Sequence, residues 1–354
     1  MAHRPTERSQ RPSAARRVPK RVARMRQAIA VAIVGMVSLG FVAALHSLGV
    51  ARGAAHDPAK ARPTIDKVSV ASLVTLPAPH AVQPFQTSPM AGEGRWRPVG
   101  RLVGGRPAVY ETTVRLPDNA AVVGGIAWMD TKLLRAKLYS GSVSPGGLFW
   151  KYTAPVSLGA SETLVAAFNG GFLLKDSNGG YLSEGHLLAP LHAGAASLVI
   201  YKNGSATVGE WGRDVTMTSA VVAVRQNLTL LVDHGQPVPG LNPADVSTWG
   251  YSLNKIANTW RSGLGVTADG ALVYVVGPMS ILDLASLLVR AGATRAMALD
   301  MNPLWPVFAT YAPASPNGVA SPANGTDVLP TMEQSPARFF EVAYARDFVT
   351  MSAP

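Results

Sequence analysis

Arg261 and Asp300 are the two side chains of this 354-residue chain whose type and setting best suit chemistry. Arg261 is the only cation between Lys255 and Arg290, within small and apolar residues, so it needs a partner if it points inward. A guanidinium binds phosphodiesters and carboxylates through its planar fork, and the carboxyl group of Asp300 can serve as an acid or a base. The structural alternatives are that Arg261 pairs with Asp300 or Glu184 to join strands, and that Asp300 caps a loop.

The segment between these two residues has the pattern of a hairpin, a helix and a strand. Asp269-Gly270 predicts the hairpin turn, with an apolar strand after it. A helix is predicted over Ser280–Ala291, because Ser280 and Asp283 form a capping box and a glycine follows the last apolar turn. Asp300 then ends an apolar run, at the strand end where sheet proteins with crossover helices tend to bind ligands.

Two upstream motifs supply further candidate site residues. Asn169-Gly170-Gly171-Phe172 offers a side-chain donor and glycines that let a backbone approach a ligand closely. The alternative is a tight turn in which the glycines serve backbone geometry alone. Glu184 is the candidate second carboxyl group, because glycoside cleavage usually needs one group to protonate the leaving oxygen and another as base or nucleophile. A surface glutamate is its structural alternative.

In this order, the motifs resemble the phosphodiester glycosidase family, which includes the enzyme that uncovers mannose 6-phosphate tags. The resemblance runs from about Ile126 to Val349. It implies hydrolysis of a sugar 1-phosphodiester, with a cell-envelope glycan as a plausible substrate class. In that scheme Arg261 and Asn169 hold the phosphate, while Asp300 and Glu184 share the acid and base roles.

The chain departs from the family after Asp300, where Met301-Asn302-Pro303-Leu304-Trp305 replaces a run of glycines. Proline has no amide hydrogen and methionine adds bulk, so a phosphate site built from glycine amides is not expected. Asn302 is then the candidate donor, and Trp305 offers a flat face for a sugar ring. These two join Gly170 and Gly171 as expected substrate-binding residues. The alternative function is an inactive envelope protein of the same fold that binds a glycan or a protein partner through this loop; a purely structural membrane protein would leave the clustered motifs unexplained.

The N-terminal region predicts a membrane anchor. Residues 28–51 contain no Asp, Glu, Lys or Arg and are long enough for a transmembrane helix. Residues 1–27 form a basic tail, which the positive-inside rule places in the cytoplasm, so the rest of the chain is expected outside the cell membrane. A cleaved signal peptide is the alternative. Residues 52–91 are rich in Pro and Ala and are expected to be a linker, and residues 92–350 the glycosidase-like domain.

Composition excludes several classes of function. The net charge of +11 comes mainly from nine Lys or Arg in the tail, which leaves 23 basic and 20 acidic residues in the rest of the chain. Nucleic-acid binding is therefore not expected. The chain has no cysteine, so thiolate nucleophiles, disulfides and zinc-thiolate sites are impossible. No cofactor is expected, and the need for a divalent metal stays open.

Strand patterns predict an α+β fold, a single domain with a mixed β-sheet and few helices, preceded by the transmembrane helix. The expected strands are 109–116, 122–129, a hairpin of 198–201 with 206–208, a pair of 221–224 with 228–232, and a closing strand over 339–345. A long Pro-rich loop over 311–330 is expected to be either a lid or mobile surface.

Overall fold

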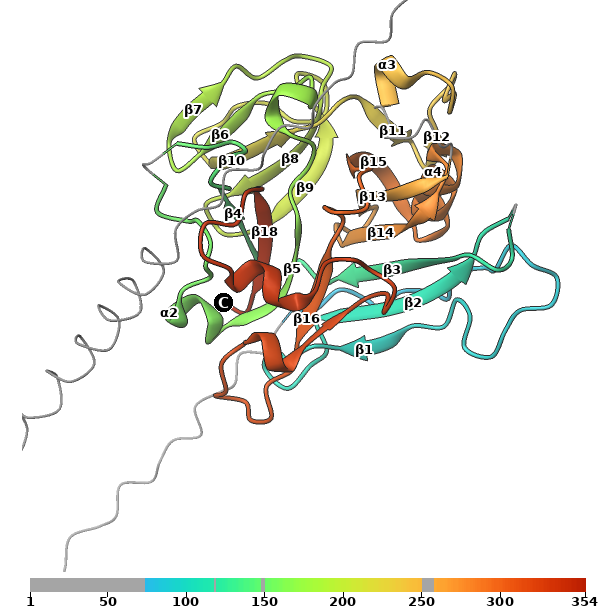
Figure 1. Ribbon diagram of the computed structural model, residues 1–354, viewed down its shortest axis with the longest axis horizontal. Helices are drawn as coiled ribbons and strands as arrows, with labels where there is room; N and C mark the ends of the chain where they lie inside the picture. Colours follow the sequence, from blue (N-terminus) through green and yellow to red (C-terminus); the bar gives the residue numbers. More distant parts are fainter. Residues whose placement is uncertain (1–73, 118, 148–149, 250–257) are drawn as a thin grey trace, which may run out of the picture. The chain divides into compact units, whose positions relative to one another are not determined.

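The structure is a computed structural model that describes residues 74–117, 119–147, 150–249 and 258–354 (Figure 1). The chain divides into two units, residues 1–69 and 70–354, and all described residues belong to the second. The predicted basic tail and transmembrane helix lie outside the described residues. Within the described ranges, no helix is both long and apolar enough to span a membrane.

The largest sheet has eight strands in the order β1-β2-β3-β14-β13-β15-β11-β12, all paired antiparallel. These strands are β1 (Arg97–Val99), β2 (Val109–Arg115), β3 (Val123–Met129), β11 (Leu230–Asp233), β12 (Gln236–Pro237), β13 (Thr259–Thr267), β14 (Leu272–Met279) and β15 (Ala293–Asp300). Strands β14 and β15 run parallel to each other on either side of β13, so the connection between them passes over one strand.

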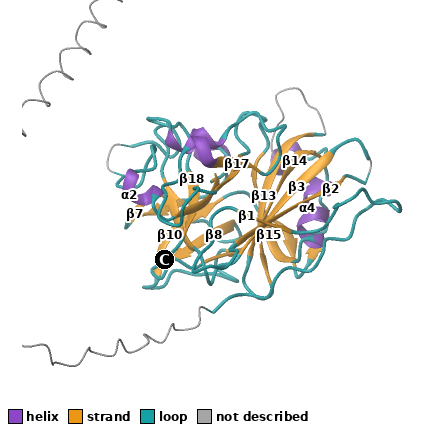
Figure 2. Ribbon diagram, turned by 90° about the horizontal axis from the view of Figure 1, so that it is seen from below, coloured by secondary structure: helices purple, strands orange, loops and turns teal. Residues whose placement is uncertain are grey.

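Helix α4 (Ile281–Arg290) makes this connection and covers one face of the sheet (Figure 2). The expected capping box is present, with Ser280 and Asp283 bonded to each other's backbone amides. The helix packs closely because β13 carries glycine where it passes beneath: a Cβ at Gly263 would lie 3.0 Å from Cδ1 of Leu288. The amphipathic pattern of the helix is thus matched by a sheet surface made flat by small residues.

Two five-stranded antiparallel sheets form the rest of the domain, in the orders β7-β6-β10-β8-β9 and β17-β16-β5-β18-β4. The first contains β6 (Tyr181–Ser183), β7 (His186–Ala189), β8 (Ala196–Tyr201), β9 (Ala206–Glu210) and β10 (Val221–Gln226). The second contains β4 (Arg135–Tyr139), β5 (Leu164–Asn169), β16 (Phe308–Tyr311), β17 (Gly325–Asp327) and β18 (Phe348–Ser352). The main hydrophobic core draws on all three sheets, so strand ends from each can meet in its interior.

The remaining helices are short. They are α2 (Leu158–Ser161), α3 (Val246–Trp249) and three 3₁₀ turns, η1 (Leu174–Asp176), η2 (Pro322–Asn324) and η3 (Pro336–Phe340). The expected strand-rich domain with few helices is therefore confirmed. The strands form three sheets, whereas the sequence suggested one, and the parallel pairs among described residues are isolated bridges such as Ser144 with Arg346.

Most expected elements are present, including the strands now labelled β2 and β3, the β8–β9 hairpin, and β15 ending at Asp300. The expected pairing of 221–224 with 228–232 is wrong, because β10 and β11 belong to different sheets. The chain crosses between them at Asn227, whose side-chain amide donates to the carbonyls of Ala298 (2.5 Å) and Leu299 (3.0 Å). Leu228 follows with a left-handed φ of 55°, and its amide donates to the carbonyl of Ser177.

The expected closing strand at 339–345 is also wrong. Residues 336–340 form η3, and the strand that closes the sheet is β18, which begins at Phe348. The aromatic residues of the segment gather in one cluster, with the Phe339 ring centroid 5.0 Å from that of Phe348 and 6.4 Å from that of Tyr344. Aromatic residues favour strands, but here they pack as a local cluster over the sheet end.

Two segments expected to be loose pack onto the domain. In the predicted linker, Val82 is buried and its amide donates to Gly94, while the guanidinium of Arg290 stacks 3.9 Å from the centroid of the Phe85 ring. In the long loop over 311–330, residues 325–327 form β17 against β16, and Ala320 is buried. The folded unit thus includes part of the expected linker, and much of the loop is fixed to a sheet edge.

Candidate functional site

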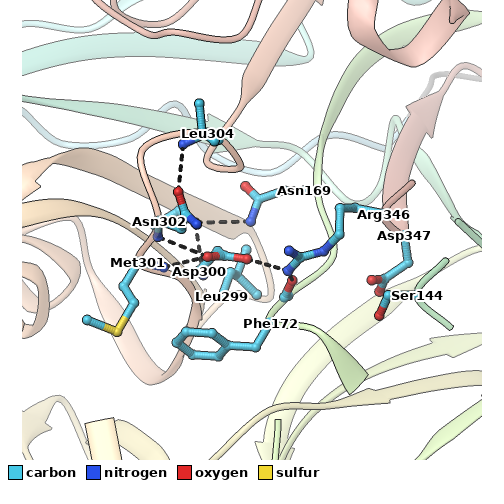
Figure 3. A network of polar contacts seen from close by, with 12 residues as sticks. Ser144, Asn169, Phe172, Leu299, Asp300, Met301, Asn302, Leu304, Arg346 and Asp347 are labelled. Atoms are coloured by element: carbon cyan, nitrogen blue, oxygen red, sulfur yellow. Dashed lines mark hydrogen bonds and ion pairs between the residues drawn. The ribbon is translucent and has the colours of Figure 1, made fainter. Parts of the chain in front are cut away.

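Asp300 lies at the end of β15, as the sequence predicts, and its carboxylate is 3% exposed. Oδ1 accepts hydrogen bonds from the amides of Met301 (2.8 Å) and Asn302 (3.0 Å). Oδ2 accepts a bond of 2.5 Å from Nη2 of Arg346, which lies just before β18 (Figure 3). The carboxylate is therefore bound to its own loop and to a buried guanidinium.

These bonds define what the divergent loop can offer a ligand. The two amides after Asp300 are taken by its own carboxylate, so they are not free to bind an anion. Asn302, an expected substrate donor, instead accepts from the amide of Leu304 at 3.1 Å. The Trp305 indole, an expected sugar platform, lies 4.7 Å from the Arg346 guanidinium, which occupies a ring contact. In this conformation the loop's polar groups and its indole ring are engaged within the protein.

Asn169, at the end of β5, is 2% exposed, and its side chain makes three hydrogen bonds (Figure 3). Its Nδ2 donates to Oγ of Ser262 at 3.1 Å, and its Oδ1 accepts from Oη of Tyr274 at 2.7 Å and from the amide of Val307 at 3.2 Å. Oγ of Ser262 also accepts from the amide of Asp300 at 3.2 Å. Asn169 and Asp300 are therefore brought together through one serine, as neighbours in a buried polar network.

Gly170 and Gly171 pack against a second buried ion pair, formed by Arg225 and Asp347. Nε of Arg225 lies 2.7 Å from Oδ2 of Asp347, and both side chains are essentially unexposed. A Cβ at Gly170 would lie 2.3 Å from that same Oδ2, and one at Gly171 would lie 3.1 Å from Nη2 of Arg225. The structure thus gives both glycines a packing role beside the ion pair. The carbonyl of Gly171 also accepts from Nη2 of Arg346 at 2.6 Å.

Arg261 is buried at 4% exposure without a carboxylate partner among the described residues. Among the described residues, the one hydrogen bond recorded for its side chain runs from Nη1 to Sδ of Met301, at 3.9 Å, and its Nε has no hydrogen-bond partner. Burial lowers the pKa of Arg261 to about 10. A buried guanidinium without a counter-ion costs several kcal/mol, about the size of the whole stability margin of many domains. Met301 therefore lies against a cation that no described carboxylate compensates.

Glu184 lies apart from this network. It occupies the β6–β7 turn with a left-handed φ of 52°, and its carboxylate accepts from the amides of Lys151 (2.8 Å) and Tyr152 (2.9 Å). Glu184 lines a cavity between β4 and the β8–β10 side of the neighbouring sheet, and Asp300 is not among the residues around that cavity. Within the described residues, the structure does not bring the two expected acid and base groups together.

Burial raises the pKa of Asp300 above its ordinary value, while Arg346 and the amides of Asn302 and Met301 lower it in part. A carboxyl group with a raised pKa is suited to proton transfer, and this one is adjacent in sequence to Met301, whose Sδ contacts the Arg261 guanidinium. The arrangement offers a cation for an anionic ligand and an acid beside it. Both side chains are buried and contact the start of the Met301–Trp305 loop.

Several residues of this network were not predicted from the sequence: Arg225, Asn227, Ser262, Tyr274, Arg346 and Asp347. A signal was present for the charged ones. Arg225 interrupts an apolar strand, and Arg346-Asp347 stands directly before one, where burial forces charges to find partners. In the part of the chain that the structure describes, no group of three or more His, Asp or Glu side chains is placed to hold a metal ion.

Comparison with known proteins bears on this site. Residues 162–300 match the sequence model of a family described as phosphodiester glycosidase, which confirms the expected resemblance over that span. The span includes Asn169, Glu184, Arg261 and Asp300. A search of curated proteins finds none that matches this chain.

Solved structures also resemble this chain. A hypothetical protein from Synechocystis aligns with a TM-score of 0.39 and 10% identity over 73% of this chain and 64% of its own. A putative exported protein from Burkholderia pseudomallei K96243 aligns with a TM-score of 0.34 and 15% identity over 66% of this chain and 74% of its own. The chain thus spans less than two thirds of the Synechocystis protein.

Proposed function

We propose, on the premise that residues 162–300 belong to the phosphodiester glycosidase family, that this chain is a hydrolase of glycosyl 1-phosphodiesters. The observation that carries the proposal is the buried guanidinium of Arg261, which no described carboxylate compensates. It contacts the side chain of Met301, and the amide of Met301 donates to the carboxylate of Asp300. A phosphodiester is an anion that would neutralise this charge and match its planar fork. Part of the chain's stability is thus given up at the place where such a substrate would bind.

The chemistry of the leaving group suits a site with one accessible carboxyl group. Cleavage at the sugar carbon releases a phosphomonoester, whose second pKa is about 6, so it leaves without the strong acid assistance that a sugar hydroxyl needs. Arg261 would stabilise the charge on the departing phosphate. Asp300 would act as base toward water or as nucleophile. Glu184 would then position the Lys151–Tyr152 backbone, in place of the acid role that the family resemblance suggested.

Substrate entry requires the Met301–Trp305 loop to swing away from Arg261. Met301 is 4% exposed, and its side chain holds the position that an incoming phosphate would take. The weak sulfur contact is easily exchanged for a charge-assisted hydrogen bond to phosphate. Opening would also free the Asp300 carboxylate from the amides of its own loop, which makes it a stronger base.

We further propose that the domain works outside the cell membrane on an envelope glycan with phosphodiester links. Support comes from the uncharged run at 28–51 and the basic tail before it. The basic tail fixes which end stays in the cytoplasm. The domain itself is close to neutral, so it has no general attraction to polyanions, and recognition would rest on Arg261, whose buried charge no described carboxylate pairs with.

A second candidate function is an inactive member of the family that binds a glycan or a protein partner. One observation favours it: the Asp300 carboxylate is paired with Arg346 and bonded to two amides, while Glu184 lies elsewhere. A catalytic pair is thus not assembled in this conformation. This candidate predicts binding of an intact glycosyl phosphodiester without release of product.

The test is a hydrolysis screen on a panel of glycosyl phosphodiesters, with the full-length chain and an Asp300→Asn variant. The hydrolase proposal expects phosphomonoester release by the natural chain and a loss of about 10²-fold or more in the variant. Asp233→Asn is a matched control, because Asp233 is a strand-end aspartate that pairs with Arg213 at the surface. Equal turnover by the natural chain and Asp300→Asn would rule out the assigned centre. Tight binding without any turnover would select the second candidate.

A further inference from the structure

A cavity of about 940 Å³ lies between β4 and the sheet that contains β6, β8 and β10, away from the Asp300 centre. Its volume falls within the range of small-molecule sites, about 300–1,000 Å³. Among the expected site residues, only Glu184 lines it, while Arg261 and Asp300 do not. The cavity is therefore a separate feature, and a ligand bound there would be independent of the proposed hydrolysis.

The cavity wall is largely apolar. Leu138 and Ile200 are buried in its floor, Leu182 and Val222 are half-buried along its sides, and Met217 stands at its edge with 51% exposure. An exposed methionine beside partly exposed aliphatic side chains leaves apolar surface in contact with water. Covering that surface with an apolar ligand contributes about 25 cal/mol per Å².

The rim of the cavity carries unpaired positive charge. Arg135, Lys137 and Lys202 line it, and none of the three makes an ion pair with a described carboxylate. The Arg135 guanidinium donates only to the carbonyls of Lys132 (3.1 Å) and Leu134 (3.0 Å). These bonds fix its position but leave its charge uncompensated. The rim therefore attracts an anion.

The one side-chain carboxylate in the lining does not cancel this charge. Both oxygens of Glu184 accept from backbone amides, at 2.8 Å from Lys151 and 2.9 Å from Tyr152. Nζ of Lys137 lies 4.2 Å from the centroid of the Tyr152 ring, so this ring face is occupied by a cation.

We propose that this cavity is a second binding site, for an amphipathic anion with a phosphate head and an alkyl or isoprenyl chain. The phosphate lies at the rim between Lys137, Lys202 and Arg135, and the chain lies over the apolar floor beside Met217. Apolar contact supplies most of the affinity, because solvated lysines at a surface contribute modestly. The rim sets the orientation and selects for the charged head.

Calorimetric titration of the full-length chain, kept free of alkyl detergent, tests this site. The probes are octyl phosphate and decyl phosphate below their micelle concentrations, with inorganic phosphate and decanol as the separate head and chain. Each added CH₂ should tighten binding about fourfold, so decyl phosphate should bind roughly 15-fold more tightly than octyl phosphate. Decyl phosphate should also bind more tightly than inorganic phosphate or decanol alone.

Substitutions locate the binding. Lys137→Gln with Lys202→Gln should weaken decyl phosphate about fivefold, and Met217→Ser should reduce the gain per CH₂. Matched controls are Lys175→Gln, at an exposed lysine away from the cavity, and Met90→Ser, at a methionine that is 62% exposed. Equal binding of inorganic phosphate and decyl phosphate would overturn the proposal. Decanol binding as tightly as decyl phosphate would overturn it as well. So would a Lys137→Gln, Lys202→Gln variant that binds decyl phosphate as tightly as the control variants do.

Discussion

Replacing Arg261 with methionine should stabilise the folded domain, an unusual outcome for a buried residue. The reason is that Arg261 is 4% exposed and, among the described residues, hydrogen-bonds only to Sδ of Met301, at 3.9 Å, so folding takes its charge out of water with no carboxylate from these residues to pair with it. Methionine has a similar length and no charge, and it would pack beside Met301 and the apolar residues under helix α4. Removing the charge removes the desolvation cost.

The size of the effect can be worked out from the guanidinium itself. Burial lowers the pKa of Arg261 from 12.5 to about 10. A shift of that size corresponds to about 3 kcal/mol against the charged form. Imperfect packing of the new side chain takes back about 1 kcal/mol. We therefore expect the free energy of unfolding to rise by about 1–2 kcal/mol, or roughly 2–8 °C in Tm for a domain of this size.

The matched comparison is Arg225→Met. Arg225 is equally buried but is paired with Asp347 at 2.7 Å, so its removal leaves a buried carboxylate alone. That change should cost about 3–5 kcal/mol. Urea unfolding of the two variants and the natural chain measures both. If Arg261→Met destabilises the fold to the same extent as Arg225→Met, the charge of Arg261 is compensated by a structural partner, and the reasoning is wrong. Added phosphate should stabilise the natural chain and leave Arg261→Met unchanged.

Three more variants test single contacts. Gly170→Ala should destabilise the domain by about 2–3 kcal/mol in urea titrations, because its Cβ would lie 2.3 Å from Oδ2 of Asp347; an unchanged midpoint would contradict the packing role of this glycine. Burial raises the pKa of Glu111 from 4.5 to about 7, so the folded state binds this proton more tightly than the unfolded chain does. This stabilisation is complete below about pH 4.5 and is lost as the pH rises to about 7, a loss of about 2–3 kcal/mol that Glu111→Gln should abolish in unfolding measured across that range. Met301→Ala should tighten the binding of a glycosyl phosphate about threefold or more, because the guanidinium beneath it is uncovered; calorimetry that gives the natural affinity would show that the methionine is no barrier.

Local signals predicted the elements that position the centre. The capping box of Ser280 and Asp283 set the start of helix α4, the Asp269-Gly270 turn set the β13–β14 hairpin, and the apolar run before Asp300 set β15. Each of these depends on residues close together in the sequence, where turn chemistry and periodicity act directly.

The buried network could not be predicted in the same way. Its contacts join residues distant in sequence, such as Asp300 with Arg346 and Arg225 with Asp347, and no local pattern specifies which buried charge pairs with which. The pairing of Arg261 with Asp300, one of the alternatives that the sequence left open, is an example, since Arg346 takes that carboxylate instead. The assignment of 221–224 and 228–232 to one hairpin failed for a related reason, because the side chain of Asn227 bonds to β15 and diverts the chain.

Arg261 is central to the proposed function, as the group that receives the phosphate of a glycosyl phosphodiester that the chain hydrolyses. The direct measurement is the initial rate of phosphomonoester release by the full-length chain, Arg261→Ala and Arg261→Lys, on the best substrate from the screen. We predict turnover by the natural chain, a loss of about 10²–10³-fold in Arg261→Ala, and partial recovery in Arg261→Lys, which keeps the charge without the planar fork. Turnover by Arg261→Ala at the natural rate would contradict this role.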